Sequence, residues 1–262
     1  MTICMAAIAK EDGEETIVFS TDHMVTTQTG QFEHGIIKYK QLNKHIVAML
    51  AGNPLIFNDL IDLTALKGKD DFESIKMEIF GNFKKKRKEI LQNELFDIYG
   101  IDHNFIIDSL KSPIPNEHVS RILAETAGFK LNTGILLIGM DEGAAKIVEI
   151  TEANIADFRE INFHAIGSGQ TQAINTLLFQ KHNKSDNLLT TIYNVYKAKR
   201  NAEVIQGVGK ETELLVLKKE GCIKIEKQYM EILDTIYENE LKFGKNNSEL
   251  SKINLKGCPK CS

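Results

Sequence analysis

Thr2 is the residue of this chain whose position is most suggestive of chemistry. Methionine aminopeptidase removes Met1 when the second residue is small, as threonine is, and Thr2 then becomes the N-terminal residue. A terminal threonine combines a nucleophile with a base, because its hydroxyl attacks and its own α-amine accepts the proton. The ordinary pKa of that amine lies near neutral pH, which suits a general base. Thr2 is therefore the candidate nucleophile. How strongly it indicates an enzyme depends on the residues that accompany it.

The sequence offers one candidate metal site, a Cys-x-x-Cys pair formed by Cys258 and Cys261. The pair is either half of a zinc site, completed by two ligands from elsewhere or from a second chain, or part of an unstructured tail. No second Cys-x-x-Cys pair occurs, and the 7 histidines have no His-x-x-x-His spacing. We therefore expect no required cofactor, with a structural zinc at these cysteines as an open alternative.

Five consecutive cations occupy residues 84–88, with the sequence Lys-Lys-Lys-Arg-Lys. One interpretation is a patch that binds anions or nucleic acid. The other is a solvated helix segment, since Glu78, Glu89 and Glu94 lie nearby in the sequence. The neighbouring acids favour the solvated helix.

The overall composition is that of an ordinary globular protein, with 42% hydrophobic and 26% charged residues. The net charge of -4 gives no global basic field, so we expect no nucleic-acid partner. No apolar run approaches about 18 residues, and no basic segment precedes the apolar start of the chain, so we expect neither a membrane span nor a signal peptide. The 4 cysteines are too few for a disulfide scaffold, which favours a cytoplasmic protein.

Blocks of strands are predicted from apolar and alternating segments. The first block covers residues 2–10, 16–22, 36–45 and 46–52, with a polar loop or irregular hairpin from 23 to 35. The Asp-Gly pair at residues 12 and 13 predicts a hairpin turn between the first two of these strands. The second covers residues 133–140, 145–150 and 163–169, and a last hairpin is expected from 213–218 and 222–225. Apolar residues at helical spacing predict a long helical region at about 54–130, and helices at about 170–182, 185–203 and 227–242.

Strands and helices therefore occur in blocks and do not alternate. This order argues against a doubly wound parallel sheet and favours an α+β protein, with two antiparallel sheets face to face and helices outside both. No linker interrupts the pattern, so we expect residues 1–226 to form one domain with a helical insertion at about 54–130. Residues 227–262 are expected to add a C-terminal helix and a polar tail with the Cys-x-x-Cys pair.

Several short motifs follow one another along this pattern. They are residues 2–8 (Thr-Ile-Cys-Met-Ala-Ala-Ile), 18–22 (Val-Phe-Ser-Thr-Asp), 37–40 (Ile-Lys-Tyr-Lys), 47–52 (Val-Ala-Met-Leu-Ala-Gly), 164–169 (His-Ala-Ile-Gly-Ser-Gly) and 210–217 (Lys-Glu-Thr-Glu-Leu-Leu-Val-Leu). In this order they resemble the motifs of the proteasome β-subunit family. The resemblance touches most of residues 2–225 and implies the four-layer αββα sandwich of the N-terminal-nucleophile hydrolases.

The resemblance implies a catalytic role for five residues. Thr2 would be the nucleophile and its amine the base, and the positive charge of Lys38 would lower the pKa of both groups. Asp22 would pair with Lys38 and keep it charged and oriented. Gly52 would supply its backbone N–H to the oxyanion, and Ser168 would hydrogen-bond near the amine of Thr2.

Three of these residues also have an ordinary structural interpretation. Asp22 can simply end a strand, Lys38 can face solvent on an edge strand, and Gly52 can stop a strand. Their joint occurrence with Thr2 makes the catalytic interpretation the favoured one.

The chain departs from the family pattern at the turn after the fourth helix. The family places Asp and Ser there, three residues apart, where this chain has Asn201 and Val204. Asn201 can hydrogen-bond but supplies no charge, so we expect a proton network that is weaker or rebuilt, with Glu203 as a candidate replacement. Met24 stands where the family has a basic residue. The chain is therefore expected to be a divergent member.

The same alignment implies a pocket for the residue that precedes the scissile bond. Val25, Ile36, Lys40 and Leu50 would line it. Leu50 would make the floor apolar, whereas Lys40 would favour an acidic or polar partner.

These residues together predict a threonine-type endopeptidase or amidohydrolase that cuts peptide or protein substrates through an acyl-enzyme at Thr2. One alternative is a transpeptidase or ligase, in which an amine resolves the same acyl-enzyme. Another is a catalytically silent, proteasome-like scaffold subunit, and a weaker one is a binding module whose tail takes zinc. The resemblance also implies a closed homo-oligomeric ring, with an unfoldase as a candidate partner.

Overall fold

The computed structural model describes residues 2–26, 30–64, 66–111 and 117–245. The chain divides into two compact units, Met1–Lys224 and Ile225–Ser262. Among the described residues of the second unit there is one helix, α7 (Lys227–Lys245). None of the described helices is both long and apolar enough to cross a membrane.

The first unit contains two five-stranded antiparallel sheets. The first sheet has the order β10-β1-β2-β11-β12, from β1 (Ile3–Glu11), β2 (Glu14–Asp22), β10 (Phe163–Gly167), β11 (Thr212–Lys218) and β12 (Gly221–Lys224). β1 and β2 are joined by Asp12 and Gly13, whose φ values of 51° and 89° suit the left-handed turn of a tight hairpin. The Asp-Gly signal in the sequence therefore sets the register of the two strands that lead to Thr2 and Asp22.

The second sheet has the order β5-β6-β7-β8-β9. Its strands are β5 (Tyr39–Asn43), β6 (Ile46–Ala51), β7 (Gly134–Asp141), β8 (Ala144–Ile150) and β9 (Ile155–Asp157). A separate hairpin of β3 (Met24–Thr26) and β4 (Gln31–Glu33) follows β2. The predicted strand at residues 36–45 is shorter than expected, and β9 has no counterpart among the predicted strands.

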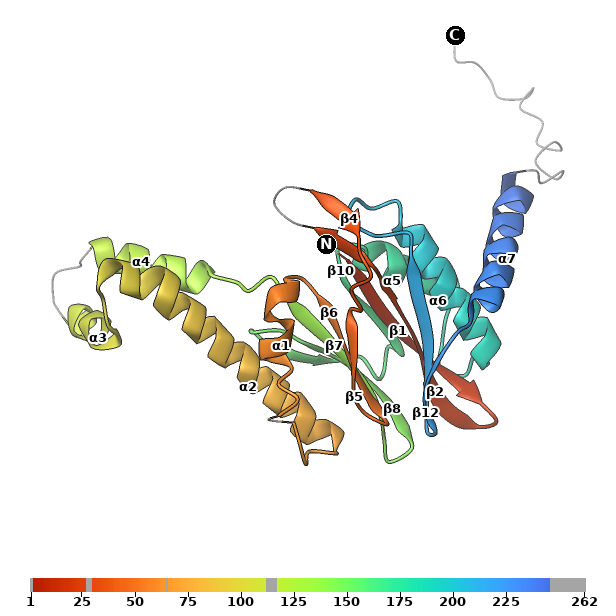
Figure 1. Cartoon of the computed structure of the whole chain (residues 1–262), viewed down its shortest axis with the longest axis horizontal. Coiled ribbons are helices and arrows are strands. Elements are labelled where there is room, and N and C mark those ends of the chain that lie inside the picture. The colour runs from red at the N-terminus through yellow and green to blue at the C-terminus, as the bar shows by residue number, and fades with distance from the viewer. Residues whose placement is uncertain (1, 27–29, 65, 112–116, 246–262) are drawn as a thin grey trace, which may run out of the picture. The chain divides into compact units, whose positions relative to one another are not determined.

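The two large sheets pack face to face and helices cover their outer faces (Figure 1). Successive residues of β6 point alternately into the core between the sheets and into the core under the helices, as expected for a strand buried on both sides. Val47, Met49 and Ala51 join the core shared with β1 and β2. Ile46, Ala48 and Leu50 join a second core beneath α1 (Phe57–Leu60) and α2 (Phe72–Leu91).

The outer face of the first sheet is covered by α5 (Gln170–Phe179) and α6 (Leu188–Ala202). The structure therefore confirms an α+β protein built on antiparallel sheets, with the helices in separate blocks. The physical reason is that long runs of apolar strand residues need cover on both faces of the sheet.

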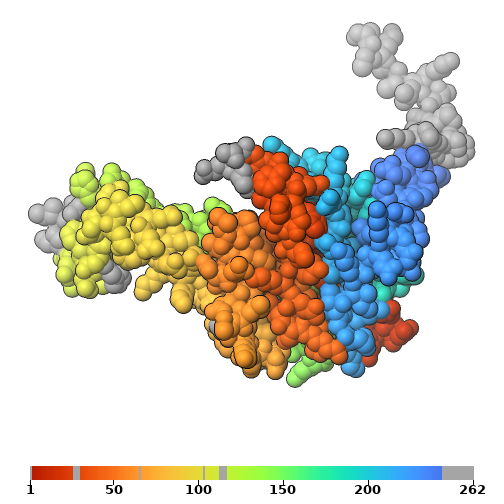
Figure 2. Space-filling view, viewed as in Figure 1, coloured from red at the N-terminus to blue at the C-terminus, as the bar shows by residue number. Residues whose placement is uncertain are grey.

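The helical region between β6 and β7 consists of several short pieces around one long helix. In chain order they are η1 (Pro54–Ile56), α1, α2, η2 (Gln92–Phe96), η3 (Asp97–Tyr99), α3 (His103–Lys111) and α4 (Glu117–Gly128). α2 begins where Asp71 accepts a hydrogen bond of 2.8 Å from the Ser74 N–H. α4 is held to α2 by Arg87, which donates to the Thr126 carbonyl at 2.6 Å. The space-filling view shows the later part of this segment, in yellow to yellow-green, protruding from the rest of the unit (Figure 2).

Candidate active site

Four segments that lie far apart in the sequence meet at Thr2. Thr2 precedes β1, Asp22 ends the neighbouring strand β2, Lys38 precedes β5, and Ser168 follows β10. The side chains are withdrawn from solvent: Thr2 is 3%, Asp22 0% and Lys38 8% exposed. Lys38 is fixed in the second sheet by its carbonyl, which accepts a hydrogen bond of 2.9 Å from the Leu50 N–H. Both sheets are therefore needed to assemble this group.

The Thr2 hydroxyl lies between a carboxylate and an ammonium group. It donates to Asp22 Oδ1 and accepts a hydrogen bond from Lys38 Nζ. Lys38 Nζ also donates to Asp22 Oδ1 at 2.6 Å and to the Met24 carbonyl at 2.5 Å. A hydroxyl that accepts from a cation can carry a developing negative charge on its oxygen, which is the requirement for a nucleophile.

Asp22 is surrounded by hydrogen-bond donors. Besides Thr2 and Lys38, its Oδ1 accepts from the Ile3 N–H at 3.1 Å, and its Oδ2 accepts from the Gly209 N–H at 2.7 Å. The Met24 N–H adds a contact of 3.4 Å to Oδ2. Buried carboxylates are stable only with such partners. Asp22 therefore serves as the anchor that holds Lys38 and Thr2 together.

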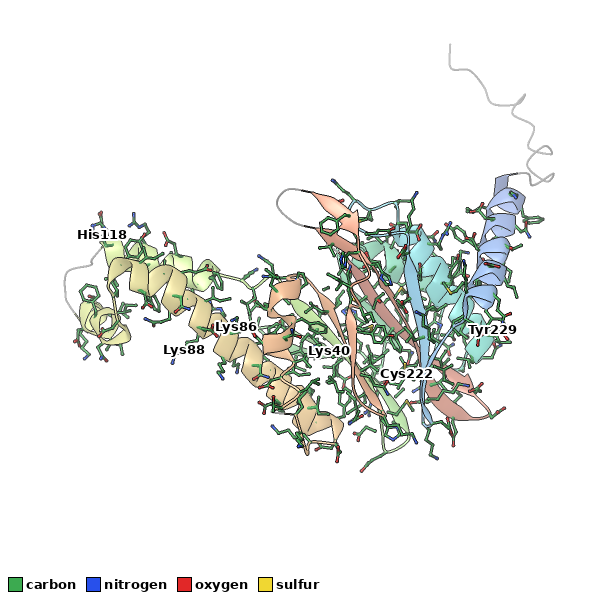
Figure 3. All side chains as sticks on the ribbon, in the orientation of Figure 1. Lys40, Lys86, Lys88, His118, Cys222 and Tyr229 are labelled. Carbon is green, nitrogen blue, oxygen red and sulfur yellow. The ribbon has the colours of Figure 1, made fainter. Side chains whose placement is uncertain are left out.

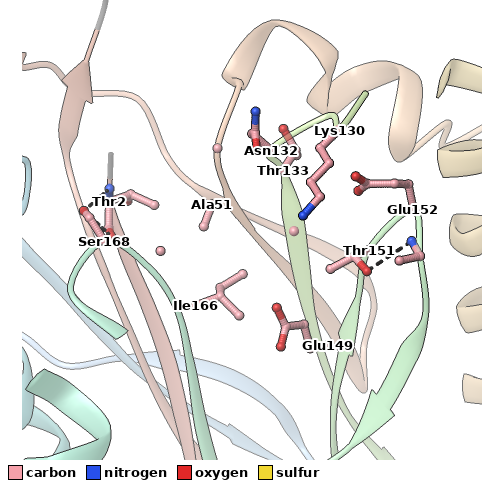
Figure 4. A pocket seen from close by; sticks show the side chains of 14 residues that line it. Thr2, Ala51, Lys130, Asn132, Thr133, Glu149, Thr151, Glu152, Ile166 and Ser168 are labelled. Atoms are coloured by element: carbon pink, nitrogen blue, oxygen red, sulfur yellow. Dashed lines mark hydrogen bonds between the residues drawn. The ribbon is translucent and has the colours of Figure 1, made fainter. Parts of the chain in front are cut away.

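Ser168 and Gly167 hold the backbone of Thr2. The Thr2 N–H donates to Ser168 Oγ at 3.2 Å, and Ser168 Oγ donates to the Thr2 carbonyl at 3.2 Å (Figure 4). Gly167 has φ +99°, and a Cβ on it would lie 2.3 Å from the Thr2 carbonyl oxygen. The strand-to-helix turn can approach Thr2 this closely only because residue 167 is glycine.

Gly52 lies at the end of β6, opposite this turn. Its φ is +123°, and a Cβ would come within 2.5 Å of the Asn132 carbonyl oxygen. The residue lines both cavities that adjoin Thr2. A glycine is therefore required by the backbone at this position, independently of any role in binding an oxyanion.

Thr2 lies between two cavities. The larger one, here called the Thr2 cavity, has a volume of about 500 Å³ and includes Ser168, Glu149, Glu152 and Lys130 in its lining (Figure 4). Glu149 Oε2 lies 2.9 Å from His164 Nε2, and the His164 ring stacks on Phe158 with centroids 3.5 Å apart. Its lining therefore brings two carboxylates, Glu149 and Glu152, and the ammonium group of Lys130 to the neighbourhood of Thr2.

The smaller cavity has a volume of about 60 Å³ and is lined mainly by apolar side chains. Three of the four predicted pocket residues, Val25, Ile36 and Leu50, line it together with Thr2 and Lys38. Lys40 does not, because its Nζ donates to Asn58 Oδ1 at 2.5 Å and lies 4.9 Å from the ring centroid of Phe57. Burial lowers the pKa of Lys40.

Asn201 contacts α5, and Val204 faces solvent. Asn201 Nδ2 donates to Thr176 Oγ1 on α5 at 3.1 Å, and Val204 is 77% exposed. The partners of the Thr2 hydroxyl and N–H in the hydrogen bonds described above are Asp22, Lys38 and Ser168. The structure thus joins Thr2 to three of the other predicted catalytic side chains and gives Asn201 a contact between α5 and α6.

A buried lysine near Asp22 was missed by the sequence reasoning. Lys199 is 0% exposed, and its Nζ donates to Glu203 Oε1 at 2.7 Å and to the Lys210 carbonyl at 2.8 Å. Burial lowers its pKa, while the charges of Glu203 and Asp22 oppose that shift. Glu203 therefore neutralises Lys199. The available signal was the i, i+4 spacing of a lysine and a glutamate on a helix.

Cys4 also brings a nucleophilic atom, its thiol sulfur, close to this group. Its Sγ lies 3.2 Å from the Leu50 carbonyl, and burial raises the pKa of the thiol far above its ordinary value. A thiol held in the neutral form is a poor nucleophile. Thr2 is therefore the better candidate.

Among the residues that the structure describes, no group of three or more His, Cys, Asp or Glu side chains could hold a metal ion. Cys258 and Cys261 lie outside the described residues. Neither models of known protein families nor curated proteins match this chain.

Proposed function

We propose that the protein is an N-terminal-threonine amidohydrolase, a peptidase of the proteasome β-subunit type with the αββα fold of N-terminal-nucleophile hydrolases. The observation that carries the proposal is the Thr2 hydroxyl, which donates to Asp22 and accepts from Lys38 beside two cavities. The proposal requires that Thr2 is the first residue of the mature chain, so that its α-amine is free.

The proposed reaction begins when Thr2 Oγ attacks the carbonyl carbon of a peptide bond. The hydroxyl proton passes to the α-amine, and the Lys38 ammonium stabilises the negative charge that develops on Oγ. The C–N bond then breaks, the leaving amine takes the proton, and an ester to Thr2 remains. Water, activated by the same amine, hydrolyses the ester and restores the free hydroxyl.

The two cavities suggest how a peptide lies across Thr2. The apolar pocket, with Leu50 in its lining, suits a small or medium apolar side chain of the residue before the scissile bond. The Thr2 cavity accommodates the chain further along. Gly52, which borders both, is the candidate donor to the oxyanion through its backbone N–H.

The proposal extends to assembly. Subunits of this type form closed rings through one repeated heterologous interface, so we expect a homo-oligomeric ring and a partner unfoldase that delivers substrate. Electron microscopy of the purified full chain tests the ring directly.

Intact-mass analysis tests the chemistry. The expected result is a chain that lacks Met1 and gains the mass of an electrophile that reacts with both the hydroxyl and the amine of an N-terminal threonine. Thr2→Ala is the matched control, because alanine also permits Met1 removal but has no hydroxyl. Retained Met1, or wild-type protein that gains no more mass than Thr2→Ala, would overturn the enzyme proposal.

A second candidate function is a proteasome-like subunit without catalytic activity. It is favoured by Asn201 and Val204, which stand where the family has Asp and Ser, and by the contact of Asn201 with Thr176. The labelling experiment separates the two candidates. If the adduct forms, peptide incubation with an added amine then distinguishes hydrolysis from transfer to that amine.

A further inference from the structure

The basic run at residues 84–88 is divided by α2 into two faces. Lys84, Arg87 and Lys88 are three and four residues apart, so they share one face of the helix. All three line a cavity of about 410 Å³, here called the basic cavity. Lys85 and Lys86 line a different cavity, of about 270 Å³. Lys86 and Lys88 are labelled on α2 in Figure 3.

In the part of the chain that the structure describes, acids lie against one of these faces and largely leave the other without compensation. Lys86 Nζ lies 2.8 Å from Asp59 Oδ2 and 3.0 Å from Glu89 Oε1, and both acids line the same cavity as Lys86. In the basic cavity, by contrast, Lys130 adds a fourth cation, and Glu152 is the single carboxylate among the described residues that line it. The basic cavity therefore carries an uncompensated positive charge.

The basic cavity also has a firm and partly apolar lining. Arg87 donates to the carbonyls of Thr126 and Phe129 at 2.6 and 3.4 Å, which fixes its guanidinium group between α2 and the end of α4. The apolar residues Leu91, Phe96 and Phe129 also line the basic cavity. A ligand that fits must combine negative charge with some apolar surface.

The basic cavity adjoins the Thr2 cavity. Lys130, Glu152 and Ala153 line both of them, and Figure 4 shows the Lys130 side chain extending into the Thr2 cavity. A chain that passes Thr2 therefore reaches the cations of α2 without crossing to another face of the unit.

We propose that the basic cavity is a binding site for an acidic segment of the peptide substrate, some residues away from the bond that Thr2 attacks. This inference rests on the proposed function and names its substrate class: peptides with Glu or Asp residues that flank the cleaved bond at a distance. A peptide fits better than a nucleic acid, because the lining is partly apolar and the path leads to a nucleophile suited to carbonyl carbon.

Peptide binding to the full-length Thr2→Ala variant tests the inference apart from catalysis. The probes are a fluorescent peptide with an apolar residue followed by a cluster of Glu, and its twin with Gln in place of Glu. We expect the Glu peptide to bind roughly tenfold more tightly at low salt, with the difference shrinking as salt is added. The preference should disappear when Lys84→Glu and Lys88→Glu are introduced together.

The matched control for Lys88→Glu alone is Lys85→Glu, since it reverses one charge on the same helix but on the other face. It should leave the preference intact, and thermal unfolding of both charge variants verifies that they fold. Equal binding of the two peptides, absence of binding, or a preference that survives the Lys84 and Lys88 changes would overturn the inference. Stronger competition by a single-stranded oligonucleotide than by the Glu peptide would also overturn it and indicate a nucleic-acid site.

The inference and the proposed function fail separately. If Thr2 takes no electrophile but the Glu peptide binds through Lys84 and Lys88, the enzyme proposal falls and the peptide site remains. If Thr2 is labelled but the two peptides bind equally, the enzyme proposal remains and the peptide site is refuted.

Discussion

Replacing Asp22 by Asn is expected to destabilise the protein more than any other isosteric change near Thr2. The side chains of Asp22 and Lys38 are 0% and 9% exposed, and their ion pair spans 2.6 Å. Removing one partner of a buried pair leaves the other charge without compensation and costs about 3–5 kcal/mol in free energy of unfolding. The loss comes from two sources, the charge of Lys38 and the donors that surround the carboxylate.

The hydrogen-bond geometry explains why Asn is a poor replacement. Oδ1 accepts from Ile3, and Oδ2 accepts from Gly209 at 2.7 Å, so both oxygens face backbone N–H groups. An amide presents only one oxygen, and its NH2 group must then oppose a donor. A buried donor left without an acceptor itself costs about 1–3 kcal/mol.

Thermal and urea unfolding measure this effect. A loss of about 3–5 kcal/mol corresponds to a fall in Tm of about 6–20 °C for a domain of this size. The exposed pair of Asp108 and Lys111, whose side chains are 72% and 71% exposed, supplies the control. Asp108→Asn should leave Tm unchanged, because water screens that pair.

A double-mutant cycle identifies the cause. If the uncompensated Lys38 charge dominates, Asp22→Asn combined with Lys38→Met should be more stable than Asp22→Asn alone. Two outcomes would refute the reasoning: a Tm for Asp22→Asn equal to that of the wild type, or strictly additive losses in the double variant.

Two further predictions concern the turn after β10 and a buried histidine. Gly167→Ala should displace Thr2, because the new Cβ would lie 2.3 Å from the Thr2 carbonyl oxygen. Intact-mass analysis should then show that labelling of Thr2 by the electrophile is lost or much slower. Labelling at the wild-type rate would contradict this prediction. Burial lowers the pKa of His182 from its ordinary value of 6.5, so the unfolded state binds the proton first as pH falls. The unfolding free energy should therefore decline below about pH 6.5, and urea titrations should show a shallower decline for His182→Gln but no change for the exposed His34→Gln.

The sequence alone was sufficient to predict the strands that carry the catalytic candidates. Apolar runs on either side of Asp12 and Gly13 predicted the hairpin of β1 and β2, because such runs need two covered faces and the Asp-Gly pair favours a tight turn. It was also sufficient to single out Thr2 as a candidate, since a threonine that becomes the terminal residue carries both a nucleophile and a base. β9 was missed because three residues are too few to show a period.

The sequence could not show how Lys38, Ser168 and Thr2 come together. Lys38 and Ser168 lie 36 and 166 positions from Thr2 in the sequence. Their contacts with Thr2 depend on the packing of two sheets and on a turn that only glycine permits at residue 167. It also could not show that Asn201 meets Thr176, because the direction of a side chain at a helix end depends on what packs against it.

The basic run at residues 84–88 separates most clearly what the sequence determined from what the tertiary structure decided. Its five cations and its helix were evident from composition and periodicity, and neighbouring acids favoured a solvated segment. Only the tertiary structure placed Asp59 of α1 against one face and left Lys84 and Lys88 beside a cavity whose lining, among the described residues, has a single carboxylate. Local patterns determine which elements form, whereas charge compensation depends on residues that are distant in sequence and near in space.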